Sequence, residues 1–270
     1  MKKSKWLDEN GRQNQIAVHR IKQKTAYFGY RRVFAEEKAQ LVRDHFNTVA
    51  KKYDLMNSLL SFGIHHLWKR TAVRIMALNP GDRILDVCGG TGDLAVLAAR
   101  AIGATGRVIV YDINRAMIEV GRNKISNSLS ENCIWYVQGD AEQLPFPEGY
   151  FDAAMVGFGI RNVTHMDKGF QEMFRVLKPG GKMMCLEFSK PTPPFFRRLY
   201  DLYSFYFMPL IGGIIAGSYK SYLHLTESIR TFVLPGKLTN VIEQAGFSRT
   251  VTRNLTNSIA IIHMATKDLT

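Results

Sequence analysis

Three aspartates stand at the carboxyl ends of short apolar runs: Asp86, Asp112 and Asp140. Apolar runs of this length are typical of buried strands. The carboxyl ends of parallel strands meet at one edge of a sheet, where open α/β folds bind their ligands. The three carboxylates are therefore expected to face one cleft and to bind a ligand with cationic and hydroxyl groups.

The glycines Gly89, Gly90 and Gly92 separate the first of these runs from a helical pattern that starts at Leu94. Glycine admits positive φ and lets a ligand approach the backbone, and the free amides of a helix N-terminus favour an anion. With Asp86 available for a cation, this turn fits a zwitterion such as the amino acid part of S-adenosylmethionine. The glycine spacing is not G-x-G-x-x-G, which weakens a dinucleotide interpretation.

The second and third acids fit the rest of such a ligand. Asp112 ends the second strand, where a carboxylate can bind two ribose hydroxyls. Asp140 can accept from an adenine amino group while the Ala141 amide donates to a ring nitrogen. Each element alone also fits an ordinary strand–helix turn whose acid caps a helix. Together they favour an adenosyl ligand.

An arginine and an asparagine follow the fourth apolar run, in the segment GFGIRNV at 157–163. Arg161 and Asn162 stand where an acceptor substrate would meet the cofactor's methyl group. The alternative for Arg161 is a surface ion pair. A guanidinium stays charged and presents a fork of donors, so Arg161 is suited to stabilise an oxyanion.

The elements that must position these residues alternate between strand and helix. This alternation predicts an α/β fold with a doubly wound, mostly parallel sheet. We expect strands near 83–87, 107–112, 133–138, 151–157 and 181–187, and helices near 93–102, 114–127 and 165–177. A helix near 236–245 and strands near 248–253 and 257–266 break the alternation and predict an antiparallel terminal hairpin.

Two helical segments add to the core of residues 81–270. Residues 36–80 are expected to form a lid over the strand ends, with Leu67, Ala72, Ile75 and Met76 of the second helix facing inward.

An apolar helical insertion is expected at 192–222, where residues 202–219 are eighteen consecutive uncharged residues. That length is near the minimum for a bilayer span, but Pro209 and several glycines interrupt it. We expect a broken helix pair that packs in the core, or one that walls a pocket for a greasy substrate and touches a membrane. Anionic headgroups would suit the cations at its ends, Arg197, Arg198 and Lys220.

Positive charge is concentrated near the N-terminal end of the 270-residue chain. Of the net charge of +13, residues 1–52 contribute +8, from thirteen Lys and Arg against five Asp and Glu. Such a segment favours an anionic partner, either nucleic acid or a membrane surface, or is only a solubilising extension. Residues 1–35 lack clear periodicity and are expected to form a flexible extension before a single domain at 36–270. The basic start has no apolar run after it, unlike a secretory signal.

The three cysteines, Cys88, Cys133 and Cys185, are widely spaced and lie in apolar runs. Neither C-x-x-C nor another metal-ligand spacing is present. We expect reduced core thiols in a cytoplasmic protein, and no metal site.

From about Val42 to the C-terminus the sequence resembles the ubiquinone/menaquinone biosynthesis C-methyltransferase family. The segments YDLMN to LLSFGIHHLWKR (53–70) and RVLKPGG to LEFSKP (175–191) are similar to the two family signatures, and 157–163 is similar to the acceptor-side loop. The resemblance implies a class I S-adenosylmethionine-dependent methyltransferase fold with seven strands, and a prenylated quinol as acceptor. The basic residues before 36 lie outside it.

The resemblance also implies cofactor contacts at Thr91, Asp112, Asp140 and Ala141. One position departs from the family pattern. Where Gly157 stands here the family commonly has a serine, so that contact must be absent or made by the backbone.

C-methylation requires a quinol hydroxyl that has lost its proton, and free phenols have pKa values near 10. The guanidinium of Arg161 is expected to stabilise the phenolate and lower that pKa, with Asn162 orienting the ring hydroxyl. Tyr53, His65 and His165 are unranked candidates for the base.

The expected partners are the quinol and an anionic membrane surface, which places the protein in the cytoplasm, peripherally bound to the inner face of the membrane. The sequence is also compatible with a homo-oligomer. The rivals are an RNA or other small-molecule methyltransferase of the same fold, for which residues 27–32 offer no recognisable module, and a non-catalytic scaffold of a quinone biosynthetic complex. The same signatures serve demethylmenaquinol and 2-polyprenyl-6-methoxy-1,4-benzoquinol, with Gly157 and residues 208–213 closer to menaquinone-type members.

Overall fold

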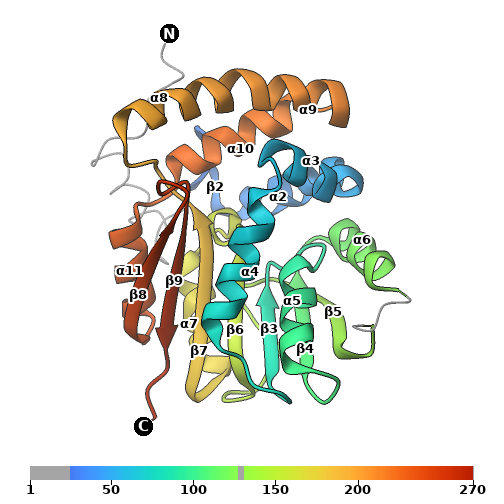
Figure 1. Cartoon of the computed structure of the whole chain (residues 1–270), viewed down its shortest axis with the longest axis vertical. Coiled ribbons are helices and arrows are strands. Elements are labelled where there is room, and N and C mark those ends of the chain that lie inside the picture. Colours follow the sequence, from blue (N-terminus) through green and yellow to red (C-terminus); the bar gives the residue numbers. More distant parts are fainter. Residues whose placement is uncertain (1–24, 127–130, 270) are drawn as a thin grey trace.

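Seven strands form the central sheet of the computed structural model, which describes residues 25–126 and 131–269. The strand order is β5-β4-β3-β6-β7-β9-β8, and only the pairs made by β9 are antiparallel. The strands are β3 (Arg83–Val87), β4 (Arg107–Asp112), β5 (Ile134–Gln138), β6 (Phe151–Gly157), β7 (Leu177–Phe188), β8 (Ser248–Leu255) and β9 (Ala260–Thr266). The expected mostly parallel sheet with an antiparallel terminal hairpin is confirmed (Figure 1).

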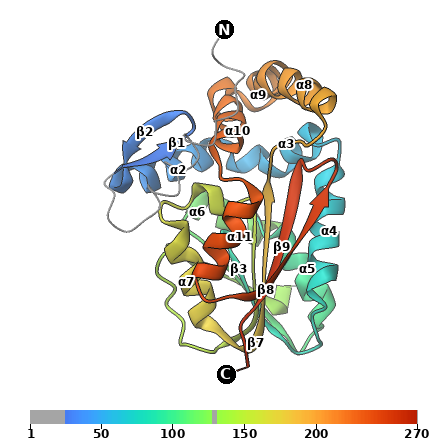
Figure 2. The same ribbon diagram turned by 90° about the vertical axis from the view of Figure 1, so that its left-hand side faces the viewer.

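Helices cover both faces of this sheet (Figure 2). On one face lie α4 (Ile64–Met76), α5 (Asp93–Ile102) and α6 (Arg115–Ile125), and on the other α7 (Met166–Val176) and α11 (Pro235–Gln244). Ile84 of β3 packs with the first set, and Leu85 and Val87 with the second. Because both faces are buried, the central strands β3, β4 and β6 are nearly continuous apolar runs.

A ligand cleft opens where the strand order reverses. β4 and β5 extend the sheet on one side of β3, and β6 and β7 on the other. At such a switch point the connections leave adjacent strands toward opposite faces, and the carboxyl ends of the strands are uncovered between them. The remaining helices lie at this end of the sheet: α2 (Ala35–Val49), α3 (Tyr53–Leu60), α8 (Pro194–Leu202), α9 (Met208–Ala216) and α10 (Tyr219–Thr231) (Figure 1).

Of residues 36–80, expected to form a lid, only α2 and α3 lie at the carboxyl ends of the strands (Figure 1), and these two helices are called the lid below. α4 packs on the sheet through Trp68, Ala72 and Met76, which are buried. Leu67, predicted to face inward, is 59% exposed. Successive helical residues lie about 100° apart, so the placing of Trp68 in the buried stripe turns Leu67 to solvent.

The expected extension at 1–35 is wrong for its last ten residues. β1 (Thr25–Phe28) and β2 (Arg31–Phe34) form an antiparallel hairpin whose turn contains Gly29 at φ 60°. Strands of four residues are too short to show a period in sequence. The predicted flexibility of residues 1–24 concerns a segment outside the described residues.

The expected broken helix pair at 192–222 is also only half correct. One helix runs without interruption from Pro194 to Ala216 and passes Pro209 after a π-helical turn, Tyr203–Phe207. It ends at Gly217, whose φ of 70° is left-handed, and α10 then starts. By length and composition alone this 23-residue helix could cross a membrane, and 22% of its apolar window is buried.

Candidate active site

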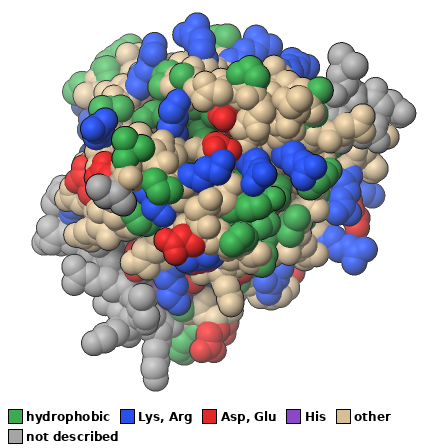
Figure 3. Space-filling view, turned by 90° about the horizontal axis from the view of Figure 1, so that it is seen from below, with side chains coloured by type: hydrophobic (Ala, Val, Ile, Leu, Met, Phe, Trp, Pro, Cys, Tyr) green, Lys and Arg blue, Asp and Glu red, His purple; other side chains and the backbone are tan. Residues whose placement is uncertain are grey.

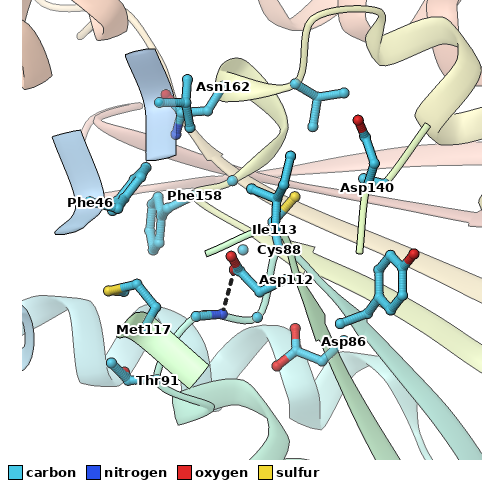
Figure 4. Close-up of a pocket in the computed structure, with 18 of the residues that line it drawn as sticks. Phe46, Asp86, Cys88, Thr91, Asp112, Ile113, Met117, Asp140, Phe158 and Asn162 are labelled. Atoms are coloured by element: carbon cyan, nitrogen blue, oxygen red, sulfur yellow. Dashed lines mark hydrogen bonds between the residues drawn. The ribbon is translucent and has the colours of Figure 1, made fainter. Parts of the chain in front are cut away.

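The first pocket lies at the carboxyl ends of β3, β4 and β6 and is called the strand-end pocket (Figure 4). Asp86 forms part of its wall, is fully buried, and has no hydrogen-bond partner for either carboxylate oxygen among the described residues. Burial and the neighbouring Asp112 raise the pKa of Asp86 to about 8. The ionised form of a buried carboxyl is costly without a partner, so a cation bound beside Asp86 would stabilise its charged form.

The glycine turn shapes the same pocket. A Cβ on Gly89 would lie 2.8 Å from the carboxylate of Asp86, and Gly90 has φ of 56°. The Gly90 amide donates to Asp112 at 2.8 Å. Gly92 was predicted to contact the cofactor but does not line the pocket. A Cβ on Gly92 would lie 2.3 Å from the hydroxyl of Tyr136, so the glycine lets the start of α5 approach this side chain of β5.

Thr91 and Asp112 line the pocket with their side chains already oriented. The Thr91 hydroxyl donates to Asp54 of α3 at 2.7 Å. Asp112 also accepts from the Asn114 amide at 2.8 Å, and burial raises its pKa to about 6. A carboxylate has about four acceptor sites, so Asp112 retains capacity for two hydroxyl groups.

Asp140, Ala141 and Gly157 complete the predicted set in the strand-end pocket. Asp140 is exposed and accepts from the Glu142 amide at 3.0 Å, which fixes its carboxylate. A Cβ on Gly157 would lie 2.4 Å from Leu94 Cδ1, so the space of a serine side chain is filled by leucine here.

Two wall residues that the sequence does not reveal carry backbone strain. Cys88 and Phe158 follow the adjacent strands β3 and β6 with φ of 54° and 57°. Left-handed backbone is uncommon for such side chains and concentrates at functional sites. Nothing in the residue types signals it.

The second pocket, called the aromatic pocket, lies beside the first, between the lid and the helices α8 to α10. Five residues line both pockets: Phe46, Tyr53, Lys69, Phe158 and Asn162. The rest of its wall is largely apolar and includes Trp68, Phe188, Tyr203, Met208, Tyr222 and Ile229. A ligand in one pocket therefore meets a ligand in the other across these shared side chains.

Arg161 is held in the wall of the aromatic pocket. Its guanidinium pairs with Glu187 at 2.9 Å, with side-chain exposures of 6% and 1%, and also donates to the Phe158 carbonyl. Its Nε has no hydrogen-bond partner among residues 25–126 and 131–269. The neighbouring loop is fixed by Lys38 of α2, whose ammonium donates to the carbonyls of Val163 at 2.9 Å and Arg161 at 3.4 Å. The ion-pair alternative for Arg161 is thus realised in the interior, not on the surface.

The sequence profile of the ubiE/COQ5 methyltransferase family matches residues 33–267. The chain belongs to this family. Proteins named ubiquinone/menaquinone biosynthesis C-methyltransferase UbiE from Pseudomonas putida (strain GB-1) and Stutzerimonas stutzeri (strain A1501) are each 46% identical over 243 residues, 90% of this chain and 95% of the relative. The chain is accordingly a methyltransferase, as its sequence predicted.

Solved structures of low identity show the same fold. An S-adenosylmethionine-dependent methyltransferase from Thermotoga maritima aligns with a TM-score of 0.59 and 18% identity, over 84% of this chain and 99% of that one. Phosphoethanolamine N-methyltransferase 2 of Haemonchus contortus, solved with S-adenosyl-L-methionine, aligns with a TM-score of 0.54 and 15% identity, over 74% and 52%. The class I fold is confirmed.

The residues of the strand-end pocket in this methyltransferase fit S-adenosylmethionine. The unpartnered Asp86 suits its ammonium, the glycine turn leaves room for the backbone to approach it, and Asp112 suits its ribose. When bound, it supplies a methyl group on a cationic sulfur.

The three base candidates differ in position. Tyr53 lines both pockets. His65 lines the aromatic pocket, contacts Ser58 at 3.2 Å, and has a pKa lowered to about 4, chiefly by burial. His165 lines neither pocket and pairs with Glu142 at 2.7 Å. Two further histidines line the aromatic pocket and were not predicted, His45 and His224.

One group of potential metal ligands occurs in the described ranges: His65, His66 and Asp93, with ligand atoms within 4.8 Å of one another. Asp93 pairs with Lys69 at 2.6 Å and with Lys124. Although burial opposes it, these ammonium groups hold the pKa of Asp93 well below its usual range. The carboxylate is thus already neutralised by two cations, and the absence of a metal stays a prediction.

Proposed function

We propose that this methyltransferase transfers a methyl group from S-adenosylmethionine to a ring carbon of a prenylated quinol. The aromatic pocket carries the proposal, because it offers flat apolar walls together with one buried guanidinium and opens onto the strand-end pocket. A quinol ring with an isoprenoid tail has this combination of a polar head and a greasy body. The C-methyltransferase names of the 46% identical relatives support the same substrate class.

The chain's own residues then have distinct tasks. Arg161, fixed by Glu187, holds positive charge beside the ring oxygen and stabilises the phenolate form. Asn162, which lines both pockets, orients the hydroxyl relative to the methyl group. The apolar walls exclude water, which strengthens these electrostatic interactions.

The quinol proposal is preferred to an RNA methyltransferase on the packing of the hairpin. RNA readers stack unpaired bases on exposed aromatic side chains. Phe28, one of the few aromatic residues of the basic segment, is instead stacked on His224 with ring centroids 3.8 Å apart. The acids and Arg161 in the two pockets weigh against a non-catalytic scaffold.

Labelled S-adenosylmethionine tests the proposal with two reduced acceptors in detergent, a demethylmenaquinol and a 2-polyprenyl-6-methoxy-1,4-benzoquinol. We expect a C-methylated product, with more from the naphthoquinol. The ratio of the two products identifies the pathway. If neither acceptor gave a product while the protein still bound S-adenosylmethionine, the proposal would be refuted.

The outer face of the helix 194–216 supports a second proposal, that the protein binds an anionic membrane surface on the cytoplasmic side. Phe195, Tyr206 and Ile214 are 75%, 68% and 75% exposed, whereas Tyr203 and Met208 of the same helix line the aromatic pocket. Figures 1 and 2 place α8 and α9 at the outermost edge of the molecule. An acceptor tail could thus pass from the lipid to the pocket beside one helix.

Figure 3 shows the opposite end of the molecule, where charged side chains of both signs are interspersed with apolar ones. Exposed apolar faces flanked by cations are typical of helices that lie in the membrane interface. The flanking cations here are Arg197, Arg198 and Lys220.

Replacement of both Tyr206 and Ile214 by glutamate is expected to reduce binding to anionic liposomes at low salt by at least about 10-fold, because each apolar side chain contributes about 1.5–3 kcal/mol when buried. Sedimentation with the vesicles measures it. Val251→Glu is the matched control, since Val251 is 62% exposed on β8. Equal binding by the wild type, the double variant and the control would contradict the membrane proposal.

A further inference from the structure

Two histidines from distant parts of the chain meet at the aromatic pocket. His45 of α2 and His224 of α10 both line it, with ring centroids 4.9 Å apart. Phe28 of β1 stacks on His224 at 3.8 Å and meets His45 edge-on at 6.5 Å. Neither imidazole makes a hydrogen bond within the described part of the chain, so both rings keep a free nitrogen lone pair.

The charged and titratable groups around the pair are Arg161, Lys38 and Glu227. Burial, with Arg161 second, lowers the pKa of His45 to about 4. Burial, followed by the neighbouring His45, Arg161 and Lys38, lowers that of His224 to about 3. Both rings are therefore neutral at neutral pH, so each can accept a hydrogen bond from a quinol hydroxyl, but in the unliganded protein both are weak bases. A phenolate forming beside them raises their proton affinity, because opposite charges attract.

The β1–β2 hairpin packs directly against the two histidines. A Cβ on Gly29 would lie 2.5 Å from the Glu227 carboxylate and 3.0 Å from His224 Nδ1. The Tyr30 amide donates to the same carboxylate at 3.4 Å. β1 precedes residue 33, where the match to the family model begins, and β2 crosses that boundary.

A small polar hollow lies on the hairpin side of His224. It is lined by His224, Arg161 and Lys38 together with Tyr27, Gly29 and Thr231. His224 and Arg161 also line the aromatic pocket, so they separate the two spaces. The far side of the His224 ring therefore faces a polar space.

We propose that the His45–His224 pair accepts the hydroxyl proton of the bound quinol. The β1–β2 hairpin covers the pair on the side away from the aromatic pocket, where the polar hollow lies. This assignment rests on the proposed function. The quinol O–H bond breaks and its proton moves to an imidazole nitrogen. A bond then forms between the ring carbon and the methyl group as the methyl–sulfur bond breaks.

The ring carbon afterwards loses its hydrogen as a proton to water, while the imidazolium returns its proton to the ring oxygen. One proton is released overall, and the pair ends neutral. The pair is preferred to His65, because the ring of His65 already contacts the Ser58 hydroxyl at 3.2 Å.

The first test compares the wild type with the variant His45→Gln/His224→Gln, with His66→Gln as the matched control because His66 is exposed and outside the pocket. General base catalysis contributes about 10²–10⁴-fold. We expect a loss of kcat of about 10² at pH 7 in the double variant, and a rise of kcat with pH from 6 to 9 that the wild type lacks. Affinity for S-adenosylmethionine in calorimetry should stay unchanged. Parallel pH profiles of wild type and double variant would overturn the assignment.

The second test needs no turnover. 4-Methoxy-1-naphthol is a phenol whose ionised form absorbs at longer wavelength, and its ionisation can be titrated while it is bound. We expect an apparent pKa of the bound probe at least about one unit lower in the wild type and in His66→Gln than in the double variant. Equal values would overturn the assignment. If the wild type methylated no quinol, the proposed function would fail, and this titration would still decide whether the pair accepts a phenolic proton.

Discussion

Replacing Arg161 by methionine and Glu187 by glutamine together is expected to lower kcat for quinol methylation by about 10³-fold while changing the affinity for S-adenosylmethionine by less than about threefold. Removal of one donor to a developing oxyanion costs about 10²–10³ in rate, and here the donor also carries a full charge. Cofactor affinity should survive because Arg161 lines the aromatic pocket and not the strand-end pocket. Single-turnover kinetics and calorimetry measure the two quantities separately.

The paired substitution is needed because of burial. Glu187 is 1% exposed, and burial raises its pKa although Arg161 lowers it. Removing Arg161 alone would leave an unpaired buried carboxylate, a change that typically destabilises by about 3–5 kcal/mol. Glu187→Gln alone is the control, since it retains the guanidinium. A similar loss of rate and of cofactor affinity in the double variant would show that Arg161 only maintains the fold.

The fold was predictable where local patterns decide it. β3, β4 and β6 have the predicted boundaries, because each is a run buried on both faces that ends at or within two residues of a glycine or aspartate. The helix 194–216 was harder to predict: a π-helical turn before Pro209 accommodates a residue that lacks an amide, and so the chain continues. The hairpin at 25–34 depends on contacts with α10, which no local pattern encodes.

The candidate site divides in the same way. Asp86, Asp112 and Asp140 were predictable because parallel strands bring their carboxyl ends together whatever the helices do. The partners of these residues were not. The His45–His224 pair joins α2 to α10, and the bond of Thr91 to Asp54 joins the glycine turn to the lid. Such contacts depend on how the lid lies over the sheet, which periodicity does not determine.

The lid also connects the two pockets. Lys38 fixes the loop that carries Arg161, and the Asn114 side chain donates to Arg43 and Asn47 of α2 at 2.9 Å. α2 is therefore bonded both to the acceptor-side loop and to the residue that orients Asp112. A structural change in either pocket is therefore expected to alter the structure of the other pocket through α2.

The affinity for S-adenosylmethionine is expected to rise by up to about 10-fold between pH 6.5 and 7.5, because of Asp86. In the unliganded protein burial raises its pKa to about 8, so most of the carboxyl is protonated at pH 7. An ammonium beside it stabilises the ionised form, so binding must release about one proton there. The rise should end near the pKa of the ligand's own α-amino group, typically about 7.7–8.0. Calorimetry in buffers of different ionisation enthalpy counts the released protons.

The raised pKa of Asp86 also determines how the stability of the folded protein changes with pH. The folded-state pKa of Asp86 lies above its unfolded value near 3.9, so between about pH 4 and 8 the folded protein binds more protons, and its stability falls as pH rises. Asp86→Asn should therefore raise the Tm of the unliganded protein at pH 8 and abolish most of the Tm increase caused by S-adenosylmethionine. Proton release that is unchanged in Asp86→Asn would show that another group receives the ammonium. A gain in stability with loss of binding would identify Asp86 as a residue whose burial is tolerated for its ligand.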